Sequence, residues 1–236
     1  MPNTGELRGV NLRKEYGSTV ALGGVTMEIP AGQSTAIIGP SGSGKSTLLH
    51  ALAAILQPDS GEVHLNGERI DRYSEGKRSA LRRTRFGFLF QFNGLLPELT
   101  ARDNVALPLM LNGTARRRAY TSADAWLHRL GIHGLTDNRP GEMSGGQAQR
   151  VALARALVIE PSVVFADEPT GALDQATGTE TLRTLLDTVK DRGASLVMVT
   201  HDLNVAGACE RVVEIRDGHI ISDSRPSATI IEEATV

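Results

Sequence analysis

A glycine-rich run at residues 39–47 has the residue types and the spacing of a phosphate-binding loop. It fills every fixed position of the pattern G-x-x-x-x-G-K-[ST]. The glycines let the backbone turn tightly and point N–H groups at phosphate oxygens. Lys45 can then reach the β- and γ-phosphates of a nucleotide, and the Ser46 hydroxyl can bind Mg²⁺. The predicted nucleotide-binding residues of this run are Gly39, Ser41, Gly42, Ser43, Gly44, Lys45, Ser46 and Thr47.

An acidic pair at the end of an apolar run is the second candidate group. Asp167 and Glu168 directly follow Val163-Val164-Phe165-Ala166. In proteins with such a phosphate loop, a carboxylate at a strand end holds Mg²⁺, and a second carboxylate beside it can activate the attacking water. A solvated turn is the alternative, since Pro169 and Gly171 suit one. The phosphate loop favours the functional interpretation, with Asp167 at the metal and Glu168 at the water.

Two further positions could contact phosphate. His201 follows the β-rich run Leu196–Thr200, at the sheet edge where ligands of open α/β folds bind. Ser144-Gly145-Gly146-Gln147 begins a predicted helix, where free N–H groups, the helix dipole and a hydroxyl make a second anion site. An ordinary helix N-cap is the alternative, and the pattern leaves open whether both anion sites bind the same nucleotide. The other histidines are interpreted as structural or surface residues: His50, His64, His128, His133 and His219.

Strands that alternate with helices must position these groups. The phosphate loop lies between a predicted strand at Ser34–Ile38 and a predicted helix. That helix is indicated by apolar residues at helical spacing, namely Leu48, Leu49, Leu52, Ile55 and Leu56. Other strands are predicted at 10–12, 25–29, 62–65, 86–90, 163–166 and 195–200, and helices at 123–130 and around 182–189, ending at Arg192-Gly193. This alternation requires a mostly parallel sheet with both faces covered.

The 236 residues are enough for one large α/β domain with an insertion. From residue 92 to residue 160 the sequence changes to helical segments broken by Gly and Pro. We therefore expect a core at about 1–91 and 161–223, an inserted helical subdomain at about 92–160, and a loosely held tail at 224–236.

The composition limits the kinds of partner. An apolar content of 40% and a charged content of 22% are ordinary for a globular protein, and a net charge of −2 gives no reason to expect nucleic acid. Arg116-Arg117-Arg118 is interpreted as a solvated helix face. Cys209 is the only cysteine, so we expect a buried, inert thiol and no intramolecular disulfide. We expect no secretion signal and no membrane span, so any membrane segments would belong to another chain.

Taken together, the motifs resemble those of ABC-transporter nucleotide-binding domains. The resemblance runs from about Leu7 to Ile221. It is carried, in the family's order and rough spacing, by residues 39–47, Gln91, Ser144–Gln147, residues 163–168, Gly171-Ala172-Leu173-Asp174 and His201. It implies an α/β fold, a P-loop NTPase (RecA-like) core with an antiparallel β subdomain and an inserted α-helical subdomain. It also implies ATP and Mg²⁺ as cofactors, and ATP hydrolysis as the activity.

The resemblance further implies roles for single residues. Two copies would pair head to tail, with ATP between the phosphate loop of one and the signature run Ser144–Gln147 of the other. Tyr16 would stack on adenine (a strand-end aromatic is the alternative), Gln91 would contact Mg²⁺ or the attacking water, and Asp174 would lie in the loop that crosses to the partner. The implied catalytic set is Glu168, His201, Lys45 and Gln91, and the implied Mg²⁺ ligands are Ser46, Gln91 and Asp167. The usual leading leucine of the signature is Met143 here, an apolar residue of similar size from which we expect little effect.

At a finer level the chain resembles the MacB-type group of lipoprotein-release, macrolide-, peptide- and haem-export and cell-division ATPases. This closer resemblance rests on the segments Phe90–Pro97, Asn104–Leu109 and Asp167–Asp174. The resemblance implies an ATPase at the cytoplasmic face of a bacterial membrane, with an integral-membrane permease docking near Gln91–Leu109. The alternatives are that these apolar residues fill the subdomain core, and that the complex transmits a signal to cell-wall hydrolases instead of exporting. A soluble ABC ATPase of DNA repair or translation is disfavoured, because neither tandem domains nor a long coiled-coil insertion is present.

Overall fold

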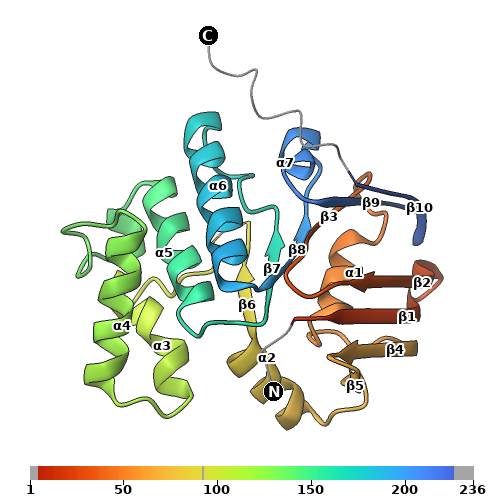
Figure 1. The fold of residues 1–236 in the computed structure, drawn as a ribbon, viewed down its shortest axis with the longest axis horizontal. Coiled ribbons are helices and arrows are strands. Elements are labelled where there is room, and N and C mark those ends of the chain that lie inside the picture. Colours follow the sequence, from red (N-terminus) through yellow and green to blue (C-terminus); the bar gives the residue numbers. More distant parts are fainter. Residues whose placement is uncertain (1–4, 92, 226–236) are drawn as a thin grey trace.

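Two sheets lie side by side, and most of the helices pack on the larger one (Figure 1). The computed structural model describes residues 5–91 and 93–225. The larger sheet has the strand order β10-β9-β3-β8-β7-β6 and is parallel except for β10. Its strands are β3 (Ser34–Ile38), β6 (Phe86–Leu89), β7 (Val163–Asp167), β8 (Ser195–Val199), β9 (Arg211–Arg216) and β10 (His219–Ser224). The smaller sheet is antiparallel and contains β1 (Leu7–Tyr16), β2 (Thr19–Ile29), β4 (Ser60–Leu65) and β5 (Glu68–Arg69).

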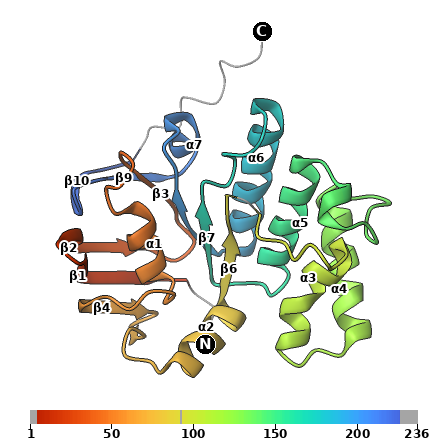
Figure 2. The same cartoon turned by 180° about the vertical axis from the view of Figure 1, so that it is seen from behind.

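The helices divide between the two sides of the larger sheet. Seen from behind, α1 (Lys45–Leu52) lies between the smaller sheet and the larger one (Figure 2). Three helices stack together at the far end of the molecule, namely α3 (Ala101–Leu111), α4 (Arg116–Arg129) and α5 (Gly145–Leu157). The remaining helices are α2 (Glu75–Arg85), a 3₁₀ turn at Pro140–Glu142, α6 (Gln175–Arg192) and α7 (Leu203–Gly207).

Each central strand is buried on both faces by alternating residues. In β7, Val163 and Phe165 belong to the core between the two sheets, whereas Val164 and Ala166 belong to the core under α5 and α6. The same alternation holds in β8, where every residue is buried. Successive side chains of a strand point to opposite faces, so a strand covered on both sides is mostly apolar. This explains why β3, β7 and β8 are short and mostly apolar, with buried Thr35 and Ser195 as polar exceptions.

The strands predicted from the sequence are confirmed as elements, but several predicted boundaries are wrong. The helix predicted at 123–130 begins at Arg116, and the strand predicted at 195–200 ends at Val199. The helix after the phosphate loop ends at Leu52, because Ala53 caps it and Ala54 takes a left-handed backbone conformation (φ 53°). Ile55 and Leu56 therefore lie beyond the helix, where their N–H groups donate to the His50 carbonyl. The strand predicted to reach Phe90 ends at Leu89.

Several elements were not predicted, among them α2, β5, α7, β9 and β10. The helix α2 has a highly polar sequence with no buried residue, so apolar spacing could not reveal it. Of the predicted tail, Ser224 ends β10, and residues 226–236 lie outside the described residues. The expectations for Cys209 and for the arginine run are confirmed. Cys209 is buried, which raises the pKa of its thiol to about 12, and Arg116, Arg117 and Arg118 lie exposed at the start of α4.

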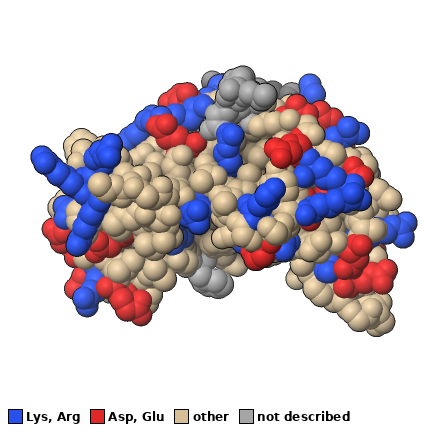
Figure 3. Space-filling model, turned by 90° about the horizontal axis from the view of Figure 1, so that it is seen from below, with Lys and Arg blue, Asp and Glu red and all other residues tan. Residues whose placement is uncertain are grey.

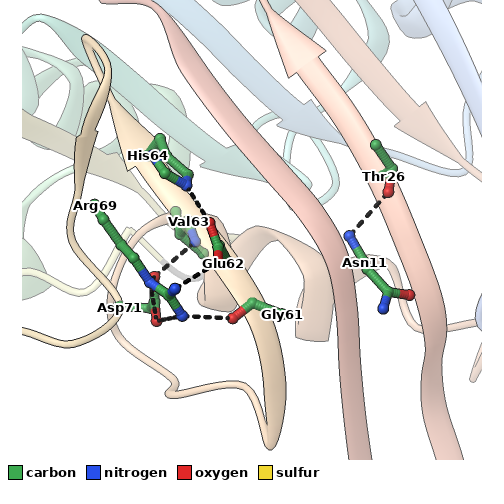
Figure 4. A network of polar contacts seen from close by, with 8 residues as sticks. All are labelled: Asn11, Thr26, Gly61, Glu62, Val63, His64, Arg69 and Asp71. Atoms are coloured by element: carbon green, nitrogen blue, oxygen red, sulfur yellow. Dashed lines mark hydrogen bonds and ion pairs between the residues drawn. The ribbon is translucent and has the colours of Figure 1, made fainter.

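A polar network closes the edge of the smaller sheet (Figure 4). The Arg69 guanidinium donates to Glu62 (2.5 Å), to Asp71 (3.0 Å) and to the Gly61 carbonyl (3.1 Å), and Asp71 also accepts from the Val63 N–H (2.9 Å). Burial tends to raise the pKa of Asp71, but the hydrogen bonds from Arg69 and Val63 lower it below its usual value. His64, predicted to be structural, belongs to this network through Glu62 (2.8 Å). The network thus ties the two-residue strand β5 to β4.

Acidic and basic side chains are interspersed over the surface seen from below, and neither sign forms a continuous field there (Figure 3). This distribution agrees with the small net charge of −2.

Close packing between β6 and α5 generates a stability prediction. A Cβ at Gly87 would lie 2.5 Å from the backbone carbonyl oxygen of Ala156, and backbone gives way less readily than a side chain. We expect Gly87→Ala to lower the free energy of unfolding by about 1–3 kcal/mol, measured by urea denaturation. Gly76→Ala is the control, because a Cβ there meets nothing within 4 Å and alanine favours the helix α2. Equal stability of the two variants would contradict the proposed packing constraint.

Candidate functional site

A cavity of about 500 Å³ lies at the carboxyl edge of the larger sheet. The segments that line it are far apart in the sequence and follow β1, β3, β6, β7 and β8. The lining residues are Tyr16, Thr19, Ala21, Ser41, Gly42, Gly44, Lys45, Ser46, Thr47, Gln91, Asp167, Glu168, Val199 and His201. A smaller cavity, of about 350 Å³, lies among α3, α4 and the end of α5 and contains none of the predicted site residues.

The phosphate loop has the backbone that its glycines permit. Gly39 (φ 146°) and Gly44 (φ 101°) lie in a region that favours glycine. A Cβ at Gly39 would be 2.0 Å from the Ile215 carbonyl oxygen, and one at Gly44 would be 2.2 Å from the Ala21 carbonyl oxygen. Both positions therefore require glycine. The loop leads directly into α1, so the positive end of that helix faces the cavity.

Lys45 lies over this loop. Its Nζ donates to the carbonyls of Gly39 and Pro40, both at 2.8 Å. The ammonium group is therefore held at the cavity by two backbone carbonyls, and among the described residues it forms no ion pair. A lysine in this position provides a compact positive charge for an anionic ligand.

Asp167 and Ser46 form an oxygen-rich pair beside Lys45. Asp167 ends β7, and burial raises the pKa of its carboxyl, while the charge of His50 and a hydrogen bond from the Ser46 hydroxyl act in the opposite direction. His50, interpreted above as a structural or surface residue, lies four residues after Ser46 on the same face of α1, and its charge acts on Asp167.

Glu168 is held by two neighbours at the end of β8. Its carboxylate lies 2.7 Å from Nδ1 of His201 and accepts a hydrogen bond from the hydroxyl of Thr200 (3.2 Å). The hydrogen bond to Glu168 raises the pKa of His201, whose side chain is otherwise exposed. Glu168 has a left-handed backbone (φ 48°), an uncommon conformation for a residue of this type that is found preferentially at functional sites. Thr200 is buried and was missed from the sequence, although it precedes His201 directly.

Gln91 and Tyr16 complete the lining of the cavity. Gln91 lies after β6, and its side-chain amide nitrogen is close to Gly171. A Cβ added at Gly171 would lie 3.3 Å from that nitrogen. Tyr16 ends β1 and is 53% exposed at the rim, with the Lys14 Nζ 5.7 Å from its ring centroid. Tyr16 thus presents an exposed aromatic ring to the cavity.

The second predicted anion site does not line this cavity. Ser144 is the N-cap of α5 and exchanges hydrogen bonds with Gln147, whose N–H donates to the serine hydroxyl (3.3 Å). Gly145 and Gly146 form the first turn of α5, and Asp174 caps α6 by accepting from the Thr177 N–H (3.0 Å). Within one chain, residues 144–147 and Asp174 are therefore separate from the phosphate loop. Met143 packs against the core, as expected for an apolar substitute for leucine.

Comparison with known proteins agrees with this geometry. Residues 22–171 match the family described as ABC transporter. The pyoverdine export ATP-binding/permease protein PvdT of Pseudomonas fluorescens is 43% identical over 222 residues, which are 92% of this chain and 34% of that protein. The lipoprotein-releasing system ATP-binding protein LolD 2 of Caulobacter vibrioides is 42% identical over 91% of this chain and 95% of that protein.

The solved structures agree as well. The dimeric structure of MJ0796, a bacterial ABC transporter cassette, has a TM-score of 0.87 at 34% identity and covers 94% of this chain and 99% of that chain. The chain spans about a third of the length of the first curated relatives that it matches. Its core is the mixed α/β fold of the P-loop NTPases, as predicted. The chain belongs to the ABC transporter family.

Proposed function

We propose that this chain binds ATP with Mg²⁺ and hydrolyses the ATP, as the ATPase subunit of a membrane export complex. The observation that carries the proposal is the meeting of three groups at one cavity: the phosphate loop with Lys45, the Ser46–Asp167 pair, and Glu168 with His201. The names of curated relatives, which include pyoverdine export, macrolide export and lipoprotein release, support the export role.

The nucleotide would enter with its phosphates at the loop and its base at the rim. The N–H groups of residues 39–47 and the N-terminus of α1 would bind the phosphate oxygens, with Lys45 exchanging its two loop carbonyls for the β- and γ-phosphates. Tyr16 would stack on adenine from its exposed position.

Mg²⁺ fits the donor atoms beside the phosphates. Ser46, Gln91 and Asp167 all offer oxygen, the ligand that Mg²⁺ prefers. Among the described residues, no group of three His, Cys, Asp or Glu side chains could hold a metal by itself, so phosphate oxygens would complete the site. When bound, Mg²⁺ neutralises charge that develops on the phosphates.

Glu168 would act as the general base. Its carboxylate accepts a proton from the water that attacks the γ-phosphate, and His201 and Thr200 orient that carboxylate. His201 would also contact the γ-phosphate. Gln91, which lines the cavity after the end of β6, would contact the water or the metal.

A second copy of the chain would complete the site. The signature residues Ser144–Gln147 lie apart from the cavity of their own chain, at an exposed helix N-terminus suited to phosphate. We propose that they contact the nucleotide held by the partner's phosphate loop, with Asp174 in the segment that crosses between the copies. The related cassette MJ0796 is described as dimeric, including a state bound to ADP and Pi.

A permease would dock near Gln91–Leu109. Phe90 (36% exposed), which directly precedes Gln91, and Leu96 (43% exposed), five residues after it, are exposed apolar residues of this segment. In the part of the chain that the structure describes, no helix is both long and apolar enough to cross a membrane. We propose that the chain is held at the cytoplasmic face of the membrane through this permease, which would select the exported substrate.

Removal of the proposed base tests the chemistry. Glu168→Gln keeps the size of the side chain but cannot take a proton, so we expect ATP hydrolysis to fall by about 10²-fold or more while ATP binding is retained. Phosphate release and a fluorescent-nucleotide titration measure the two effects. Lys45→Ala should weaken nucleotide binding itself. Glu180→Gln, at an exposed glutamate of α6, is the control, and near-normal hydrolysis by Glu168→Gln would remove Glu168 from the role.

The head-to-tail arrangement is tested by Ser144→Asp. Aspartate is as good an N-cap as serine, so α5 should remain intact, but its negative charge would repel the partner's nucleotide. We expect size-exclusion chromatography with ATP to show a dimer for Glu168→Gln and a monomer for Glu168→Gln/Ser144→Asp, with nucleotide binding by the monomer unchanged. A double variant that dimerises like Glu168→Gln would contradict the arrangement.

Co-purification tests the docking surface. The tagged chain expressed in its host should retain an integral-membrane subunit, and Leu96→Glu should lose it because a charge would be buried against an apolar partner. Ile221→Glu, at an exposed apolar residue of β10, is the control and should retain the subunit. Loss with both variants, or with neither, would argue against docking beside Gln91. The ligand that stimulates hydrolysis by the complex would then identify the substrate.

A further inference from the structure

Arg155 is a partly buried arginine of α5 whose charge is bound by backbone instead of by an acid. The two terminal nitrogens of its guanidinium group donate to the carbonyls of Gly94 (2.6 Å) and Asn93 (2.8 Å). Among the described residues it forms no ion pair, and burial lowers the pKa of Arg155, although arginine stays protonated in proteins. Hydrogen bonds from a charged donor are stronger than those between neutral groups.

The two carbonyls belong to the loop that directly follows Gln91. The Asn93 N–H donates to the Phe90 carbonyl (3.0 Å), which encloses Gln91 in a turn. Asn93 (φ 49°) and Gly94 (φ 60°) both have left-handed backbones, and their types are the ones that best tolerate this conformation. A planar guanidinium can bind two neighbouring carbonyls in a fixed geometry. Arg155 therefore holds the loop at two points just beyond Gln91.

The helix that carries Arg155 begins at the signature residues. Ser144 caps α5, and Arg155 lies 11 residues later on the same helix, a rise of about 16 Å. The same helix also reaches the loop after the acidic pair, because the buried Gln149 amide donates to the Pro169 carbonyl (2.7 Å). One rigid element thus contacts the loops that carry Gln91 and Glu168, and its first turn is the segment proposed to face the partner's nucleotide.

Resting on the function proposed above, we propose that Arg155 is a positioning residue for hydrolysis, which fixes the loop after Gln91 and so holds the Gln91 side chain at the nucleotide cavity. Arg155 touches neither the cavity nor the proposed metal ligands' side chains, and it acts through the backbone of Asn93 and Gly94. It links the position of Gln91 to the helix that begins at Ser144.

Substitutions at Arg155 in the full chain give the first test. Arg155→Gln removes the positive charge and the pair of guanidinium N–H donors that bind the two carbonyls. We expect kcat for ATP hydrolysis to fall about 10- to 100-fold because Gln91 is misplaced, with little change in nucleotide affinity. Arg155→Lys keeps the charge but offers a single ammonium group, so it should restore part of kcat. Arg150→Gln is the matched control, since Arg150 lies on the same helix and pairs with the exposed Glu180. Unchanged kcat in Arg155→Gln would overturn the assignment.

A double-mutant cycle with Gln91→Ala separates positioning from general stability. If Arg155 acts through Gln91, Arg155→Gln should reduce kcat much less in the Gln91→Ala background than in the wild type. Fold-reductions that simply multiply would overturn the assignment, because a merely structural role lowers activity whether or not Gln91 is present. Should Arg155→Gln fail to fold in thermal unfolding, the cycle is run with Arg155→Lys. A wild type without ATP hydrolysis would refute the proposed function, whereas an active wild type with a multiplicative cycle would refute the role of Arg155 alone.

Discussion

Parallel pairing of β3, β8, β7 and β6 is the constraint on which the site depends. Parallel strands carry their carboxyl ends to one edge, so the phosphate loop, His201, the acidic pair and Gln91 meet there from four distant parts of the chain. The strands are buried on both faces by alternating residues, and a slip of one residue would exchange the two cores. Packing of the whole domain therefore fixes the edge on which the charged groups lie.

Charge at this edge is balanced locally. Asp167 and Glu168 are adjacent in the sequence, and the charge of Glu168 raises the pKa of Asp167 because like charges repel. The Ser46 hydroxyl and the charge of His50 favour the ionised form of Asp167, whereas His201 and the buried Thr200 are hydrogen-bonded to Glu168. The two acids thus have different surroundings, as their different proposed roles require, and a divalent cation beside Asp167 would remove the remaining repulsion.

Prediction from the sequence succeeded where a local pattern has one physical meaning. The phosphate loop needs glycine at Gly39 and Gly44 because backbone from distant segments occupies the space of a side chain, and the motif records that requirement. Prediction from the sequence failed where contacts between distant parts of the chain decide where an element begins or ends. Apolar spacing through Ile55 predicted a longer helix, but Ala54 turns left-handed and Arg82 binds its carbonyl (2.5 Å). The helix α2 was missed because it buries no residue and so has no apolar spacing to reveal it; contacts with distant elements hold it, such as Arg83 with Asn112.

The sequence by itself determined the chemistry, because phosphate-binding glycines, a lysine, paired acids and a histidine at strand ends are recognisable by type and spacing. The tertiary structure decided which of these groups share a cavity. It brought Lys45, Asp167, Glu168, His201, Gln91 and Tyr16 together and left Ser144–Gln147 and Asp174 apart. It also revealed Thr200 and Arg155, whose hydrogen bonds span 32 and 62 residues of the chain, and His50, whose charge acts on Asp167 from another element. Such contacts depend on how the elements pack, and no local pattern encodes that.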